Sequence, residues 1–328
     1  MKALLAGWLF ALLVAAPLLH AGVDFSASEP APGNLRFTWI HGSLSAKANQ
    51  DVRVQVHRYN EHTYILRQNP AVHWEAPFMY LLFGQQRAVL LDAGATQEAE
   101  YFPLRATVQR VVARWEQANQ VELEEVVVMP LGASDFQIAG LGQFEGWSQA
   151  RVVQPTPAAR LDELGQAWPQ QGQLDLGGRV LKFMPAPGLE TQAIVAYDAW
   201  TQVMFSGNAI YPGRLVIRDF TAYLKTLEQL QAFAGSTPVK ALWGGRIEMS
   251  ADPGLDFILR ANYRPNERNL PLSTDALADA LGIVRLINGT TDIHIHDDFI
   301  VMHGVGRGAR AYGWPVYIPE QFRKNNTR

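Results

Sequence analysis

The chain has 328 residues, with 28 lysines and arginines against 31 aspartates and glutamates and a formal net charge of -3. This near-neutral balance excludes the basic surface that nucleic-acid phosphates require, so we expect no nucleic-acid partner. The absence of cysteine excludes thiolate catalysis, disulfides and metal sites with sulfur ligands. A metal site in this chain would therefore depend on His, Asp or Glu.

The first 21 residues are typical of a secretory signal peptide. Lys2 precedes an apolar run over 3–19, and the small residue Ala21 suits cleavage. The run is at the short limit for spanning ~30 Å of hydrocarbon, and no basic stop-transfer cluster follows it. We expect cleavage and export to a periplasm or to the medium, with an uncleaved anchor helix as the alternative. No later stretch is long and apolar enough to cross a membrane.

After a lead segment with prolines and a glycine at 29–33, the first half of the chain predicts strands with one helix. Apolar runs bounded by turn residues predict strands over 63–66, 78–83 and 88–92. Apolar residues at helical spacing from Leu104 to Trp115 predict an amphipathic helix. A buried strand is expected next, over 126–129.

The second half of the chain has a similar pattern. Strands are predicted over 179–184, 193–197 and 203–206, followed by a helix over 220–233 that ends at Gly235, and by a strand over 239–243. Two β-rich halves that each carry helices predict two sheets between helical layers, with function where the strand ends of both halves meet. In the tail we expect a short helix over 275–281 and a β-hairpin through 294–302.

Seven segments place a turn directly after a predicted strand. They are HRYNEHTYILRQN (57–69), EAPFMYLLFG (75–84), AVLLDAGAT (88–96), VVVMPLGASDFQIAGLGQF (126–144), PAPGLETQAIVAYD (185–198), MFSGNAIYPGRL (204–215) and LWGGRIEM (242–249). Together and in this order, they resemble the metallo-β-lactamase fold superfamily, specifically a secreted metallo-hydrolase-like branch, from about residue 54 to residue 271. The resemblance implies an α/β fold, a four-layer αββα sandwich of the metallo-β-lactamase type.

The resemblance also implies a division of the chain. Residues 1–21 are the signal peptide and 22–50 an N-terminal lead segment. Residues 51–271 form the metallo-β-lactamase-like domain, and 272–328 form a C-terminal extension with a helix and a β-hairpin.

All seven positions at which hydrolases of this family hold two metal ions are substituted. In the family's H-x-H-x-D-H loop the three histidines correspond to Gly132, Ser134 and Gln137, and the aspartate to Phe136. The remaining two histidines correspond to Leu189 and Arg246, and the bridging aspartate to Asn208. Zinc needs three or four N, O or S donors, whereas Gly, Phe and Leu supply none and Arg repels a cation. We therefore expect neither the zinc nor the iron of the family as a cofactor.

The substitutions also follow a pattern of charge. Loss of two metal cations would leave buried carboxylates without partners, which is costly. Two carboxylates are replaced, by Phe136 and Asn208, and Arg246 adds a positive charge. Asp92, a loop-bracing position in the family, is retained. Our hypothesis is that Asp92 pairs with Arg246, and the alternative is that Arg246 points to solvent.

Other sites have weaker support. His294 and His296, with Asp292 or Asp298, share one face of a strand because side chains alternate, and H-x-H on a strand is a known metal geometry. The favoured interpretation is a solvated hairpin face, with metal as the alternative. Ser134 beside Asp135 has no nearby histidine and no nucleophile elbow. The glycine-rich stretches 140–142 and 304–308 lack a dinucleotide fingerprint, and we interpret Arg307 and Arg310 as solvated.

The main hypothesis is a binding or regulatory protein that has lost hydrolysis, with an unknown small polar ligand or a protein partner. One alternative is a hydrolase with a non-standard site, which would use metal at His294 and His296 or acid–base chemistry by Arg246 and Asp135. Another is a structural partner of an active paralogue. We expect the former ligand positions to form a cleft, with five further candidates for ligand binding or bracing: Asp92, Asp135, Glu190, Tyr211 and Arg214.

Overall fold

The computed structural model describes residues 23–26, 29–165, 169–170 and 172–307. The predicted signal peptide and Arg310 lie outside these residues. Among the residues described, no helix has the length and apolar character needed to span a bilayer.

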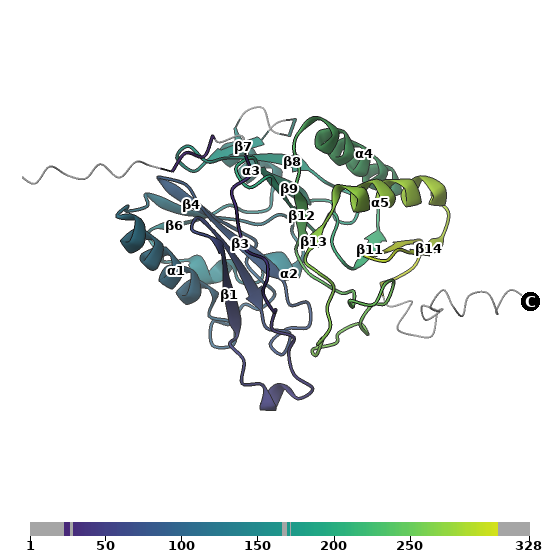
Figure 1. Ribbon diagram of the computed structural model, residues 1–328, viewed down its shortest axis with the longest axis horizontal. Helices are drawn as coiled ribbons and strands as arrows, with labels where there is room; N and C mark the ends of the chain where they lie inside the picture. Colours follow the sequence, from purple (N-terminus) through teal and green to yellow (C-terminus); the bar gives the residue numbers. More distant parts are fainter. Residues whose placement is uncertain (1–22, 27–28, 166–168, 171, 308–328) are drawn as a thin grey trace, which may run out of the picture.

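Two six-stranded sheets form the centre of the molecule (Figure 1). In the first sheet, strands β1 to β4 are antiparallel, and β5 and β6 add in parallel. Its strands follow chain order: β1 (Val54–Asn60), β2 (Thr63–Gln68), β3 (Phe78–Phe83), β4 (Arg87–Leu91), β5 (Glu125–Met129) and β6 (Ala150–Val152).

The second sheet is antiparallel except for the parallel pair β10 and β12. A small third sheet has the order β11-β15-β14 and consists of β11 (Arg214–Ile217), β15 (Ile300–His303) and β14 (Asp292–Ile295). The order in the second sheet is β13 (Pro271–Leu272), β12 (Ala241–Gly244), β10 (Val203–Gly207), β9 (Ile194–Asp198), β8 (Val180–Pro185) and β7 (Gly172–Asp175).

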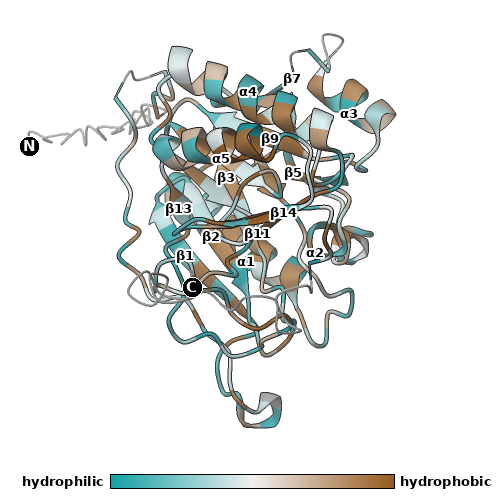
Figure 2. Cartoon of the chain, turned by 90° about the vertical axis from the view of Figure 1, so that its right-hand side faces the viewer, coloured by the Kyte–Doolittle hydropathy of each residue, from teal (hydrophilic) through white to brown (hydrophobic). Residues whose placement is uncertain are grey.

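The helices cover the outer faces of the two sheets. Helix α1 (Leu104–Asn119) lies on the first sheet, and α4 (Phe220–Ser236) and α5 (Thr274–Ile287) lie on the second. Figure 2 shows apolar residues alternating with polar ones along α4 and α5, as expected for helices with one buried face. Short helices complete the chain: η1 (Ala46–Ala48), α2 (Asp135–Ile138), η2 (Leu141–Phe144) and α3 (Pro157–Leu164).

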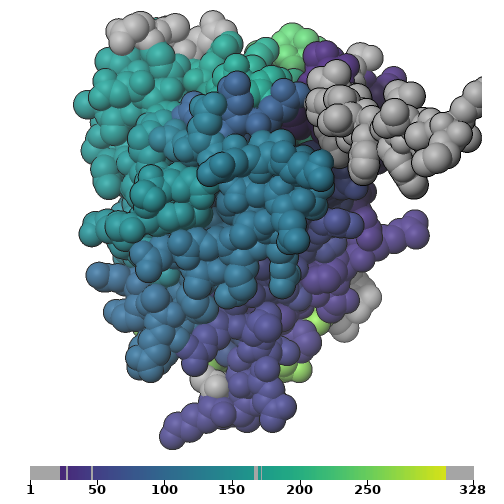
Figure 3. Space-filling view, turned by 90° about the vertical axis from the view of Figure 1, so that its left-hand side faces the viewer, coloured from purple at the N-terminus to yellow at the C-terminus, as the bar shows by residue number. Residues whose placement is uncertain are grey.

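Three apolar clusters separate these layers. One lies between the two sheets and includes Phe78, Val127, Phe205 and Trp243. A second lies between the first sheet and α1, and a third between the second sheet and the pair α4 and α5. Figure 3 shows the outer face on the side of α1, with residues of that region (blue) at its centre. The order of these layers, helix, sheet, sheet and helix, confirms the predicted αββα sandwich.

The structure also changes some predicted elements. Helix α4 continues through Gly235 to Ser236, and α5 is longer than predicted because it continues past 281 to a left-handed cap at Asn288. Strands β1 and β11 were not predicted. In β1 polar residues alternate with apolar ones and several side chains are only partly buried, and β11 has four residues and begins with an arginine. Neither strand therefore forms the long apolar run by which the central strands were recognised.

Candidate functional site

A cavity of about 820 Å³ lies where loops from both halves of the chain meet. Nine of the twelve predicted site residues line it, and the other three, Gly132, Gln137 and Asp92, lie directly behind its wall. A second cavity of about 630 Å³ lies between segments 33–41 and 264–271 and contains none of them. The nine lining residues are Ser134, Asp135, Phe136, Leu189, Glu190, Asn208, Tyr211, Arg214 and Arg246.

Asp92 braces the loop that follows β5. Its backbone is left-handed, with φ of 66°, and its side chain is fully buried. Oδ1 accepts hydrogen bonds from the backbone N–H of Leu131 at 2.7 Å and from Nε2 of Gln137 at 3.1 Å. Burial raises the pKa of Asp92 to about 7, although these two hydrogen bonds oppose the rise. Asp92 therefore bonds to Gln137, and the predicted pairing with Arg246 is wrong.

Glu190 and Gln137 fill the space behind Gly132. A Cβ atom on Gly132 would lie 2.3 Å from Oε1 of Gln137 and 2.6 Å from Oε2 of Glu190. The carboxylate of Glu190 accepts hydrogen bonds from the backbone N–H of Ala133 and, at 2.7 Å, from Oγ of Ser134. A side chain at the position that corresponds to the family's first histidine would therefore require Gln137 and Glu190 to move.

Arg246 is enclosed between two aromatic rings. Its guanidinium carbon lies 4.2 Å from the ring centroid of Phe136 and 4.4 Å from that of Tyr211, and the residue is 5% exposed. Nη2 donates to the Tyr211 hydroxyl at 2.6 Å and to Oδ1 of Asn208 at 3.1 Å. The alternative that Arg246 points to solvent is therefore also wrong. A guanidinium does not release its proton in proteins, so this geometry gives no support to acid–base chemistry with Asp135.

Two buried carboxylates that were not predicted neutralise this cation. Oε2 of Glu75 lies 3.3 Å from Nη1 of Arg246, and Oε1 of Glu248 lies 3.8 Å from its Nε. Burial alone would raise the pKa of Glu248, but Arg307, Arg246 and Arg214 lower it to about 2. Burial likewise opposes ionisation of Glu75, yet Arg246 and Arg307 hold its pKa below the usual value.

Arg307 is a third residue of this network that the sequence did not reveal. Its guanidinium pairs with Glu75 and Glu248 and lies over the ring of Trp74, so the interpretation of Arg307 as solvated is wrong. The other end of the network is Arg214, which is buried and pairs with Asp256 at 2.6 Å. The available sequence signal for Glu248 was its position two residues after Arg246 in the LWGGRIEM segment.

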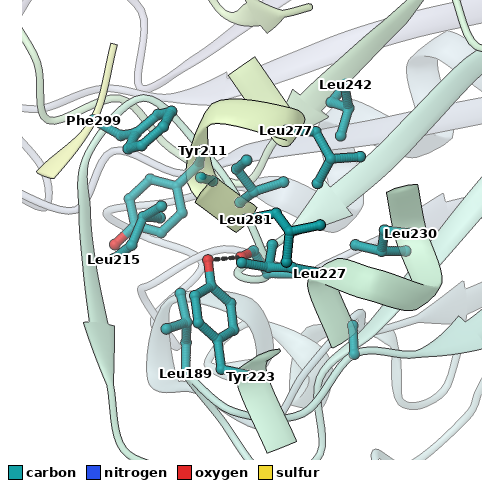
Figure 4. Close-up of a cluster of buried hydrophobic side chains, with 14 of the residues drawn as sticks. Leu189, Tyr211, Leu215, Tyr223, Leu227, Leu230, Leu242, Leu277, Leu281 and Phe299 are labelled. Atoms are coloured by element: carbon teal, nitrogen blue, oxygen red, sulfur yellow. Dashed lines mark hydrogen bonds between the residues drawn. The ribbon is translucent and has the colours of Figure 1, made fainter. Parts of the chain in front are cut away.

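Leu189 is the most apolar of the substitutions. It belongs to the buried cluster under α4 and lies beside Tyr223, whose hydroxyl donates to the carbonyl of Ala209 at 3.0 Å (Figure 4). A histidine here would place a polar ring in this cluster, so Leu189 extends the core to the edge of the cavity.

The residues at these seven positions do not fit a zinc or iron ion. None is a histidine or a carboxylate, one is an arginine, and Gly132 has no side chain that could donate to a metal. Throughout the described part of the chain, no group of three or more His, Cys, Asp or Glu residues is arranged to hold a metal ion.

His294 and His296 line a shallow depression against α5. Nδ1 of His296 accepts a hydrogen bond from the backbone N–H of Asp298 at 3.1 Å, so in the neutral ring Nε2 carries the proton. This Nε2 faces Oδ2 of Asp279 at 3.3 Å. Both ring nitrogens of His296 are thus engaged within the protein, which favours the interpretation as a polar hairpin face.

No protein-family model and no curated protein matches the chain. Among solved structures it is similar to a metallo-β-lactamase from Pontibacter korlensis, with 13% identity over 71% of this chain and 99% of that chain and a TM-score of 0.47. It is also similar to TMB-1, studied for substrate and inhibitor binding, with 12% identity over 71% of this chain and 100% of that chain and a TM-score of 0.46.

The chain has a metallo-β-lactamase-type fold. The four layers and the strand orders described above agree with the sandwich that the sequence predicts. One fold supports many activities, so no activity of these two proteins is carried over to this chain.

Proposed function

We propose that this protein is an exported, metal-free relative of the metallo-hydrolases that binds a small polar ligand or a protein partner without hydrolysing it. The observation that supports this most directly is the placement of Arg246. A fixed cation, enclosed by Phe136 and Tyr211 and neutralised by Glu75 and Glu248, stands among the positions that correspond to the family's metal ligands. Arginine has no acceptor atom, so Arg246 itself cannot coordinate a metal ion.

The wall of the cavity supports binding of a polar molecule. It combines hydrogen-bonding groups such as Ser134 and Asn208 with charges of both signs and with the aromatic rings of Trp74 and Tyr211. Such a mixture orients a ligand by a few polar contacts and supplies apolar area for burial. Export is part of the proposal because the N-terminal sequence has the features of a signal peptide.

The test is the metal content of the mature protein, purified without a histidine tag, incubated with zinc or iron, dialysed and measured by inductively coupled plasma mass spectrometry. We expect less than about a tenth of an equivalent per chain. One or two tightly held equivalents would contradict the proposal. The matched control is the double variant His294→Ala/His296→Ala: metal that disappears in this variant would belong to the hairpin, and metal that persists would belong elsewhere.

A further inference from the structure

Arg307 occupies a well-defined site at the edge of the cavity. Its Nη1 and Nη2 lie 2.8 Å and 3.1 Å from the two carboxylate oxygens of Glu75, which is the parallel two-bond geometry of guanidinium recognition. Nη2 also donates to Oε1 of Glu248. The guanidinium carbon lies 5.0 Å from the ring centroid of Trp74, within the range of cation–π attraction.

The groups that hold Arg307 are fixed parts of the fold. Glu75 is 8% exposed and Glu248 is 4% exposed, and the second oxygen of Glu248 accepts the backbone N–H of Arg214 at 2.8 Å. Buried carboxylates are stable only with cationic or hydrogen-bonding partners. Without Arg307, Arg246 would still face both carboxylates, with its Nη1 3.3 Å from Glu75 and its Nε 3.8 Å from Glu248.

Arg307 is the most accessible of the three cations in this network. Its side chain is 26% exposed, whereas the side chains of Arg246 and Arg214 are 6% and 4% exposed. It follows β15 at the end of the described residues, whereas Arg246 is held between two rings. A competing cation would therefore displace Arg307 first.

We propose that Trp74, Glu75 and Glu248 form a guanidinium-binding subsite of the cleft, filled here by Arg307, and that a ligand bearing a guanidinium group, such as an arginine side chain of a peptide, binds there by displacing it. This inference rests on the proposed function of the cleft as a binding site. It also narrows the ligand class, because an ammonium group cannot form the parallel pair of hydrogen bonds to Glu75.

The test uses methylguanidinium as the probe and isothermal titration calorimetry as the readout, with EDTA present in every buffer. The variant Arg307→Ala empties the subsite, so we expect it to bind methylguanidinium at least tenfold more tightly than the wild type. Methylammonium at the same concentration should bind Arg307→Ala at least fivefold more weakly than methylguanidinium. The matched control is Arg285→Ala, which removes an exposed arginine paired with Glu228 and should bind as the wild type does.

A second variant locates the binding. Glu75→Gln in the Arg307→Ala background should abolish the gained affinity, because the amide provides only one acceptor oxygen. If Arg307→Ala does not fold, Arg307→Lys is used in its place, because lysine keeps the positive charge but cannot form the two parallel hydrogen bonds to Glu75. The Arg307→Lys variant should also bind methylguanidinium more tightly than the wild type. Equal affinity in wild type and variant, or equal affinity for the two probes, would overturn the inference.

The two proposals fail in different ways. Metal in the mass-spectrometric measurement would overturn the proposed function and leave the methylguanidinium result, obtained with chelator, unaffected. A metal-free protein whose Arg307→Ala variant gains no affinity would overturn the subsite alone.

Discussion

The guanidinium carbon of Arg246 lies 4.2 Å from the centroid of the Phe136 ring. The resemblance predicts that both residues stand at positions where the hydrolases have metal ligands, and here the two side chains contact each other. An arginine over an aromatic face is stabilised by the ring quadrupole, most strongly where water is excluded. Phe136 therefore helps to accommodate the buried cation of Arg246.

Replacing Arg246 by methionine should destabilise the protein. Arg246→Met removes the cation near Glu75 and Glu248, and loss of one partner from a buried ionic network costs about 3 kcal/mol. The free energy of unfolding is measured by urea titration. Arg285→Met is the control, because its ion pair is exposed and should contribute less than about 1 kcal/mol. Equal stability of the two variants would show that the charge of Arg246 is not needed.

A methyl group at residue 132 should be poorly tolerated. Gly132→Ala places Cβ 2.3 Å from Oε1 of Gln137 and 2.6 Å from Oε2 of Glu190, so these buried side chains must move, which costs about 1–3 kcal/mol. Gly142→Ala is the matched control, because nothing lies within 4 Å of a Cβ there. Thermal unfolding of both variants checks this prediction, and a melting temperature for Gly132→Ala equal to that of Gly142→Ala would contradict it.

Asp92 should make stability fall as the pH rises. Burial, with a smaller contribution from Glu190, raises its pKa from 3.8 to about 7 against opposition from Leu131, Gln137 and Arg160. Between these two pH values the folded state keeps a proton that the unfolded state releases, so the stabilising effect is present below pH 4 and is lost as the pH rises towards 7.

The asparagine variant isolates this effect. Because the amide of Asp92→Asn does not titrate, the wild type should lose up to about 4 kcal/mol relative to the variant between pH 4 and pH 8, at about 1.4 kcal/mol per pKa unit. Urea unfolding of both proteins at pH 4.5, 6 and 8 measures it. A difference in free energy of unfolding that stays constant across this pH range would exclude a raised pKa of Asp92 in the folded state.

Glu248 should make the free energy of unfolding fall as the pH decreases, the opposite of the effect of Asp92. Burial alone would raise its pKa, but Arg307, Arg246 and Arg214 lower it from 4.5 to about 2. The folded state then binds fewer protons than the unfolded state, so the stabilisation is present above pH 4.5 and is lost as the pH falls towards 2.

The corresponding variant is Glu248→Gln. The free energy of unfolding of the wild type should exceed that of Glu248→Gln by about 3 kcal/mol less at pH 2 than at pH 6, as measured by urea unfolding. Glu228→Gln, which removes an exposed carboxylate, is the matched control. A wild-type advantage over Glu248→Gln that stays constant with pH would mean that the arginine neighbours do not lower the pKa of Glu248.

The architecture was predictable because the central strands are buried on both faces. Strands β3, β9 and β10 are buried along their whole length and therefore appear in the sequence as short apolar runs. Strand β1 is only partly buried and includes polar residues such as Gln55 and Arg58, so it gave no such run. The central strands of both sheets could therefore be predicted from the sequence, whereas the edge strand β1 could not.

The positions of the cleft residues could be predicted, but not their partners. The motifs placed Arg246 at the site, yet its ion pairs with Glu75 and Glu248 depend on how segments far apart in the chain meet. Arg307 and Glu75 are 232 residues apart. A glycine-rich stretch such as 304–308 carries no periodic signal for burial, so Arg307 was interpreted as solvated.

The parallel pairing of β11 with β15 has a consequence for folding. These strands come from distant parts of the chain, and closing so long a loop is slow compared with forming hairpins such as β2 and β3. Arg214 lies in β11, and Arg307 follows β15. We therefore expect both sheets to form before the ionic network closes. A chain caught before this last step would have an ordered β-sandwich, while Arg214 and Arg307 still lacked their carboxylate partners.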